Sequence, residues 1–165
     1  MDLLDRLLEH DAWTTRQLIQ RCGKLPDEEL DRRFDIGHRS IRATLQHIIF
    51  NMEAWSALIA GDAVQKSTSP DDGESMPDFI RRLDRAAERL ADVAKAVSLR
   101  GAWDERWLDV LDQPPTEKSY GGAIAHVITH SMHHRAQLLY MLRQIGLENL
   151  PEGDVLSWEH QRTPV

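Results

Sequence analysis

Residues 119–146 read SYGGAIAHVITHSMHHRAQLLYMLRQIG. Apolar side chains in this stretch recur largely at three- and four-residue steps, the period of one face of an α-helix. Ser119 is a favourable N-cap, and Gly146 is a favourable stop signal. The stretch therefore predicts one long helix, which carries a group of histidines: His126, His130, His133 and His134.

The same period predicts three further helices, over residues 2–21, 40–60 and 77–99. Residues 61–77 are rich in turn formers and form the longest connection, and residues 102–118 predict an irregular or short-strand connection. Four long helices without alternating strands predict an all-α fold, a four-helix bundle whose two long connections allow crossovers.

Composition predicts a single domain over residues 1–165, because 41% of the residues are hydrophobic and 28% are charged. Twenty Lys and Arg against 27 Asp and Glu give a net charge of −7. This charge disfavours nucleic-acid binding, which requires a positive field.

The single cysteine, Cys22, excludes an intrachain disulfide and any cysteine-rich zinc motif, and it suits a reducing compartment. The N-terminus begins with an acidic, charged pattern that does not resemble a signal peptide. No run approaches 18 apolar residues, so no membrane insertion is expected. These features predict a cytoplasmic protein.

At about 100° per residue, the histidines of the 119–146 helix share one arc. His130 and His134 lie nearest to its apolar stripe, whereas His126 and His133 lie further towards its polar side. The i, i+4 spacing of His130 and His134 lets two imidazoles bind one metal ion from successive turns.

His47 lies in an uncharged arc of the 40–60 helix and is expected to face the interior. A lone histidine there is commonly a hydrogen-bonded core residue. Three imidazoles in one core are costly to bury unpaired, whereas a divalent ion satisfies three lone pairs and leaves open positions. This reasoning favours His47, His130 and His134 as metal ligands.

Neighbouring polar residues have two interpretations each. Asn51 and Gln137 are placed either to support the site or to pack as ordinary polar residues. Arg135 falls near the middle of an apolar face, so it is expected to pair with a carboxylate or to reach an interface.

The spacing of the residues argues against other types of metal or catalytic site. A di-iron bundle needs Glu-x-x-His on two helices, and no glutamate here has a histidine three residues later. The His10-Asp11 pair resembles a metal phosphohydrolase motif, but no histidine precedes it. The chain contains no Gly-rich phosphate loop, no Gly-x-Ser-x-Gly and no His-Glu-x-x-His.

Two stretches, SIRATLQHI at residues 40–48 and THSMHHRAQ at residues 129–137, resemble the DinB-like (DinB/YfiT) superfamily of metalloenzymes. The most specific element is His-Arg-x-Gln, with a second histidine four residues before its own. Glu53-Ala54-Trp55, Trp13 and the tail at residues 150–158 support the resemblance, which spans most of the chain.

The resemblance implies that His47, His130 and His134 hold a divalent ion, most often nickel or zinc, with iron or manganese as further candidates. It leaves His126 and His133 outside the coordination sphere. It also implies an up-down-down-up four-helix bundle and frequent homodimers. Similar proteins include transferases and isomerases that use low-molecular-weight thiols.

Three functional hypotheses remain open. The first is a metal-dependent enzyme that acts on a small molecule, either as a low-molecular-weight-thiol S-transferase or as a hydrolase. The second is a non-catalytic metal-binding or stress-response protein. The third is a helical dimer with core histidines and no metal.

Overall fold

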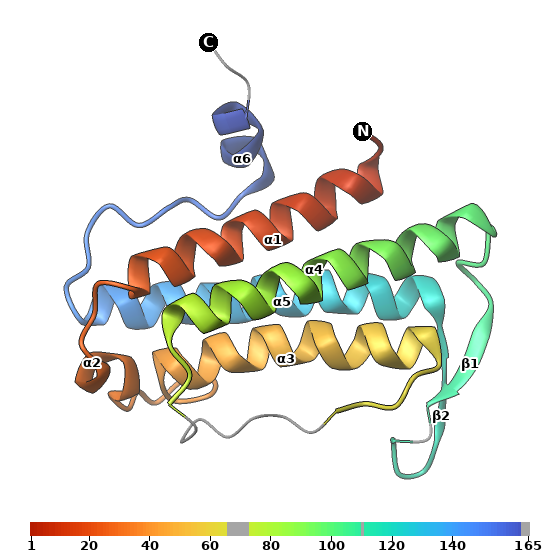
Figure 1. The fold of residues 1–165 in the computed structure, drawn as a ribbon, viewed down its shortest axis with the longest axis horizontal. Coiled ribbons are helices and arrows are strands. Elements are labelled where there is room, and N and C mark those ends of the chain that lie inside the picture. Colours follow the sequence, from red (N-terminus) through yellow and green to blue (C-terminus); the bar gives the residue numbers. More distant parts are fainter. Residues whose placement is uncertain (66–72, 110, 163–165) are drawn as a thin grey trace.

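The computed structural model describes residues 1–65, 73–109 and 111–162. Four long helices lie side by side, and α3 and α4 run in one direction while α1 and α5 run in the other (Figure 1). Each of α1 and α3 contacts both α4 and α5. The long helices are α1 (Leu3–Cys22), α3 (Ile41–Ala60), α4 (Met76–Leu99) and α5 (Tyr120–Gln144).

The four long helices lie where the hydrophobic period predicts them. Side-chain oxygens of Asp2, Ser40, Ser75 and Ser119 accept hydrogen bonds from the backbone amides of the first turns. These caps satisfy amides that have no partner within the helix. The sequence therefore specifies the helix starts through local chemistry.

Two short helices were not expected. They are α2 (Asp27–Asp31) and α6 (Val155–Arg162). Each buries one side chain, Leu30 in α2 and Trp158 in α6. A single apolar contact leaves no periodic pattern in the sequence, which is why both helices escaped prediction.

The chain between α4 and α5 forms a two-stranded hairpin beside the otherwise helical fold. Strands β1 (Arg106–Asp109) and β2 (Thr116–Ser119) pair antiparallel, with Asp109 opposite Thr116. This confirms the short-strand alternative for residues 102–118. Of the predicted connection at 61–77, residues 66–72 lie outside the described residues.

The core lies between the four long helices, and buried side chains from all of them meet there. Fully buried members include Leu18, Ile19, Ile48, Ile49, Met52, Phe79, Leu83, Leu138 and Met141. No helix within the described ranges is both long enough and apolar enough to cross a bilayer.

One buried ion pair joins α1 to α5. Arg135 donates to the carboxylate of Asp11, and both side chains are at most 4% exposed. This confirms the expected pairing of Arg135. The neighbouring His10 bonds through Nε2 to the carbonyl oxygen of Gly153 at 2.9 Å. The His10-Asp11 pair therefore holds α1 to α5 and to the C-terminal segment.

Candidate metal centre

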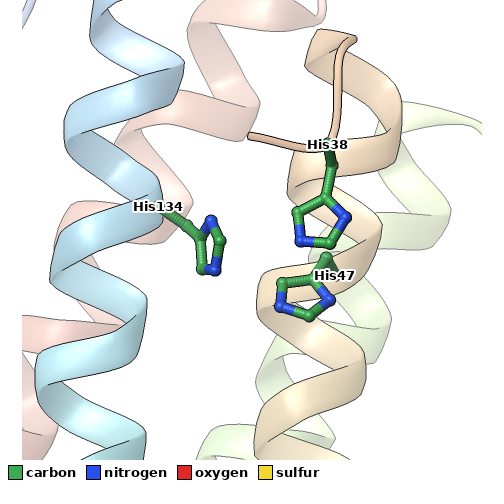
Figure 2. A group of neighbouring side chains, drawn as sticks. All are labelled: His38, His47 and His134. Atoms are coloured by element: carbon green, nitrogen blue, oxygen red, sulfur yellow. The ribbon is translucent and has the colours of Figure 1, made fainter. Parts of the chain in front are cut away.

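Histidines from three parts of the chain meet between α3 and α5. His47 lies on α3, His134 lies on α5, and His38 comes from the turn before α3 (Figure 2). One ring nitrogen from each of these three lies within 4.8 Å of the other two. Because α3 packs against α5, residues far apart in the sequence are brought to one point.

His130 belongs to the same group. Its Nε2 lies 3.3 Å from Nε2 of His47 and 3.2 Å from Nε2 of His134. Two nitrogens bound tetrahedrally to one zinc, each at about 2.05 Å, lie about 3.3 Å apart. The three histidines singled out by the sequence are thus close together, at spacings that suit a shared ion.

His38 is the member that sequence reasoning missed. It lies in a polar turn without helical period, so no pattern placed it near the others. Its ring stacks on that of His47, with centroids 3.7 Å apart and planes at 28°. The sequence feature that could have pointed to this turn is the glycine next to His38. Gly37 adopts a positive φ of 49°, a conformation that glycine accepts more readily than other residues.

The turn that carries His38 is closed by its own backbone. The amide of Phe34 donates to the carbonyl of Arg39 at 2.8 Å, and the amide of Arg39 donates to the carbonyl of Ile36 at 2.9 Å. A Cβ at Gly37 would overlap the side chain of Gln137 on α5. The missing side chain therefore lets this turn approach α5.

Gln137 orients one of the imidazoles. Its Oε1 accepts a hydrogen bond from Nδ1 of His134 at 2.9 Å, which leaves Nε2 of His134 with a free lone pair. Its Nε2 donates to Nε2 of His133 at 2.8 Å. His133 itself is exposed and lies outside the cluster.

Burial keeps these imidazoles neutral. Desolvation, with smaller effects from neighbouring histidines, lowers the pKa of His47 to about 3 and that of His130 to about 4. Partial desolvation also lowers the pKa of His38 and of His134. Neutral imidazole is the form that binds a metal ion, so the group is ready to bind at neutral pH.

The donor set fits a divalent transition metal. Imidazole nitrogen suits zinc, nickel and iron better than it suits magnesium or calcium. Two buried polar atoms near these residues, Nδ1 of His130 and Oδ1 of Asn51, have no hydrogen-bond partner in the described part of the chain. The site therefore combines free lone pairs with unsatisfied polar groups.

Two comparisons with known proteins agree with this arrangement. The DinB family matches residues 1–162. The chain is 22% identical over 161 residues to Protein DinB of Bacillus subtilis (strain 168), covering 91% of this chain and 90% of that protein. These matches confirm the resemblance first seen in the histidine-bearing stretches. Since the family match extends over almost the whole chain, the protein belongs to the DinB family.

Proposed function

We propose that the protein is a metal-dependent enzyme whose divalent ion, zinc or nickel, is held by His47, His130 and His134. The observation that carries this proposal is the convergence of their Nε2 atoms, with spacings of 3.2 and 3.3 Å to that of His130. The up-down-down-up four-helix bundle is proposed as the scaffold that brings these residues together.

Small-molecule thiol transfer is the reaction we favour. A divalent ion at this site supplies a Lewis acid that lowers the pKa of a thiol or of water. The histidine group contains no Asp or Glu among the residues that the structure describes. Hydrolysis at comparable sites uses a carboxylate base, whereas a thiol needs no base once it is ionised, because thiolate is the nucleophile.

The proposed step balances as a substitution. The thiolate sulfur forms a bond to an electrophilic carbon, and the leaving group departs with the electron pair of the broken bond. The proton lost by the thiol goes to solvent or to that leaving group. His47, His130 and His134 orient the reacting groups by holding the ion.

An open side supports an enzyme over a closed structural metal site. His38 is exposed, and it lines a cleft next to the cluster. Structural zinc sites have four protein ligands, whereas catalytic sites keep a position open. We therefore place the non-catalytic metal-binding protein second.

The test begins with elemental analysis of untagged protein from metal-replete cells. We expect about one metal ion per chain, as for a mononuclear three-ligand site. We expect its loss in His47→Ala and in the double variant His130→Ala/His134→Ala. His133→Ala is the matched control and should keep the metal, because His133 is outside the cluster.

Metal content unaffected by the ligand substitutions would overturn the proposal. The loaded protein is next assayed for transfer of 2-mercaptoethanol or cysteine to 1-chloro-2,4-dinitrobenzene, and for ester hydrolysis. Thiol transfer that follows metal content supports the transferase. Hydrolysis alone would assign a hydrolase, and tight metal binding with neither activity would favour the non-catalytic protein.

A further inference from the structure

A cleft of about 570 Å³ opens beside the histidine cluster. This size suits a small molecule. His38 lines it, and the ring of His38 stacks on His47. A molecule in the cleft would therefore lie next to the proposed metal site. Five charged side chains also line the cleft: Asp27, Asp31, Arg33, Arg39 and Arg42.

Both carboxylates of the cleft are already engaged by Arg42. Its Nε donates to Asp31 at 2.7 Å, and its Nη2 donates to Asp27 at 2.5 Å. The Arg42 side chain is only 6% exposed. Because a cation would have to displace this buried guanidinium, the two carboxylates are poorly suited to bind a cation.

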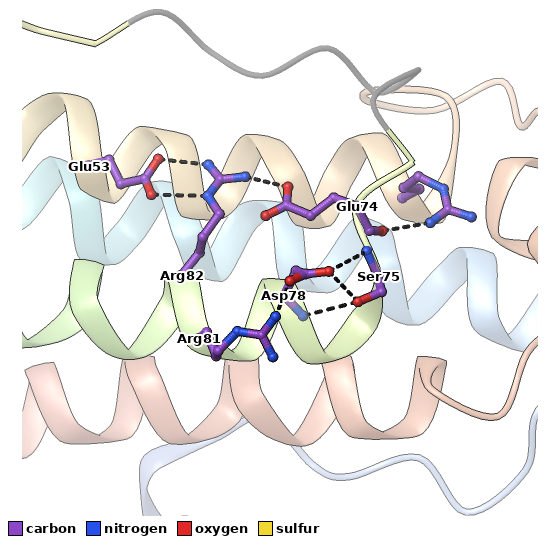
Figure 3. A network of polar contacts seen from close by, with 7 residues as sticks. Glu53, Glu74, Ser75, Asp78, Arg81 and Arg82 are labelled. Carbon is purple, nitrogen blue, oxygen red and sulfur yellow. Dashed lines mark hydrogen bonds and ion pairs between the residues drawn. The ribbon is translucent and has the colours of Figure 1, made fainter.

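The wall of the cleft is held in place by a second arginine. Arg42 donates to the backbone oxygen of Glu74 at 3.0 Å, and Arg82 donates to the Glu74 carboxylate at 2.5 Å. Arg82 also donates to Glu53 on α3 at 2.7 Å (Figure 3). Ser75 then caps α4 by accepting from the amide of Asp78. The wall is thus built by packed, paired groups.

Two guanidinium groups remain in the cleft, those of Arg33 and Arg39. Among the described residues, neither side chain makes an ion pair or a hydrogen bond. Among the described residues that line the cleft, three arginines outnumber two aspartates, although the chain as a whole carries a net charge of −7. This local excess of positive charge favours anions.

The backbone conformation fixes the position of Arg39. Arg39 has a φ of 68°, a strained conformation that non-glycine residues rarely adopt. The hydrogen bonds of its amide to Ile36 and of its carbonyl to Phe34 hold it there. This turn places the adjacent His38 at the metal site and Arg39 in the cleft.

We propose that this cleft binds the anionic end of the substrate, a carboxylate or a phosphate, through Arg33 and Arg39. The planar guanidinium fork matches both groups in two-point hydrogen bonding. The other end of the substrate reaches past His38 to the reaction site. This assignment rests on the proposed function and adds a substrate class to it: a small molecule with a negative charge at the end remote from the reacting atom.

The first experiment uses metal-free protein, because succinate and phosphate also bind metal ions. The arginine Nε–Hε signals are followed by NMR during titration with succinate, uncharged succinamide and inorganic phosphate. We expect the Arg33 and Arg39 signals to shift with the anions and not with succinamide. The tighter of the two anions identifies the group as a carboxylate or as a phosphate.

Substitutions make the assignment specific. Arg33→Gln and Arg39→Gln should each weaken anion binding on the order of tenfold, the effect of losing a charge-assisted hydrogen bond. Arg32→Gln is the matched control and should bind as the wild type does, since Arg32 stacks on Phe34 and does not line the cleft. Circular dichroism verifies that each variant is folded.

The second experiment uses the cobalt-loaded protein and two thiols of equal length, 3-mercaptopropionate and its uncharged amide. The visible spectrum of cobalt reports thiol binding, and the acid should bind about tenfold tighter than the amide, with the difference lost in Arg33→Gln/Arg39→Gln. If both thiols bind with equal affinity and the Arg33 and Arg39 signals do not shift with succinate, the cleft assignment is wrong and the proposed function is unaffected. If neither thiol changes the cobalt spectrum but the Arg33 and Arg39 signals do shift with succinate, the proposed thiol reaction is wrong and the anion site is supported.

Discussion

Gln137 illustrates how one side chain prepares another for metal binding. It accepts from Nδ1 of His134 and at the same time donates to His133. The first bond selects the tautomer whose Nε2 lone pair points towards His130. The amide therefore fixes both the protonation and the orientation of a proposed ligand.

Gln137→Ala should lower metal affinity about 10- to 100-fold, the usual loss when the partner of a ligating histidine is removed. Competition with a chromophoric chelator measures the affinity. Gln137→Glu keeps an acceptor for Nδ1 and should retain most of the affinity, while Gln144→Ala on the same helix is a neutral control. Equal affinity in Gln137→Ala and the wild type would show that His134 needs no such partner.

Cys22 predicts a dependence of stability on pH. Burial raises the pKa of its thiol to about 12, from 9.0 for an exposed thiol. A raised pKa contributes stability that is present below the unfolded value and is lost as pH rises above it. Between pH 8 and pH 10 the thiol should therefore remove about 1.4 kcal/mol from the free energy of unfolding.

Urea denaturation at the two pH values measures this loss, and Cys22→Ala isolates it from other groups that titrate in the same range. The wild type should lose more stability than the variant over the interval. The native thiol should also resist a disulfide reagent at pH 8, because Cys22 is fully buried. Rapid labelling of the native protein would contradict this account.

Among the structural elements, the turn over residues 34–39 links the fold to the site. It carries His38 to the cluster and Arg39 to the cleft, and it reaches α5 through the contact of Gly37 with Gln137. The long helices α3 and α5 carry His47, His130 and His134, whereas this turn carries the fourth histidine of the cluster, His38. The turn therefore decides how the exposed side of the site is built.

Gly37→Ala tests the turn. Its positive φ of 49° disfavours alanine, and the added Cβ would also displace Gln137. We expect a loss of more than about 1 kcal/mol in stability together with weaker metal binding. Gly101→Ala is the matched control: its φ is 65° and nothing lies within 4 Å of the added Cβ, so only the backbone contributes. Similar effects of both substitutions would argue against the Gly37–Gln137 contact.

Viewed as a whole molecule, the protein leaves an uncharged strip of α5 exposed. Met132 is 54% exposed and Tyr140 is 47% exposed, with the small, exposed Ala136 between them on the same face. We propose that this strip is the contact of the expected homodimer.

The double variant Met132→Glu/Tyr140→Glu should be monomeric, because burying two carboxylates in such a contact is unfavourable. Light scattering after size-exclusion chromatography gives the mass in solution. Leu99→Glu alters an apolar residue on α4 that is even more exposed, at 89%, and should leave the mass unchanged. A wild-type monomer would refute the dimer.

Much of the architecture was predictable because it depends on short-range chemistry. Helical period, serine and aspartate caps and terminating glycines specify α1, α3, α4 and α5 within one or two residues. The i, i+4 pair His130 and His134, with His47 on an uncharged arc, was enough to single out three histidines that the fold brings together. The DinB resemblance rests on those same residues and is confirmed.

Other features depend on contacts between distant parts of the chain. His38 joins the cluster because Gly37 lets its turn lie against Gln137, one hundred residues later in the sequence. The anion specificity that we propose for the cleft depends on Arg42, which engages two aspartates and leaves Arg33 and Arg39 without a side-chain partner among the described residues. Periodicity reports which face of a helix is buried, but it carries no information about which irregular turn will pack on that face. Which turn packs on that face depends on side-chain packing and charge pairing, and these contacts form only once the helices have assembled.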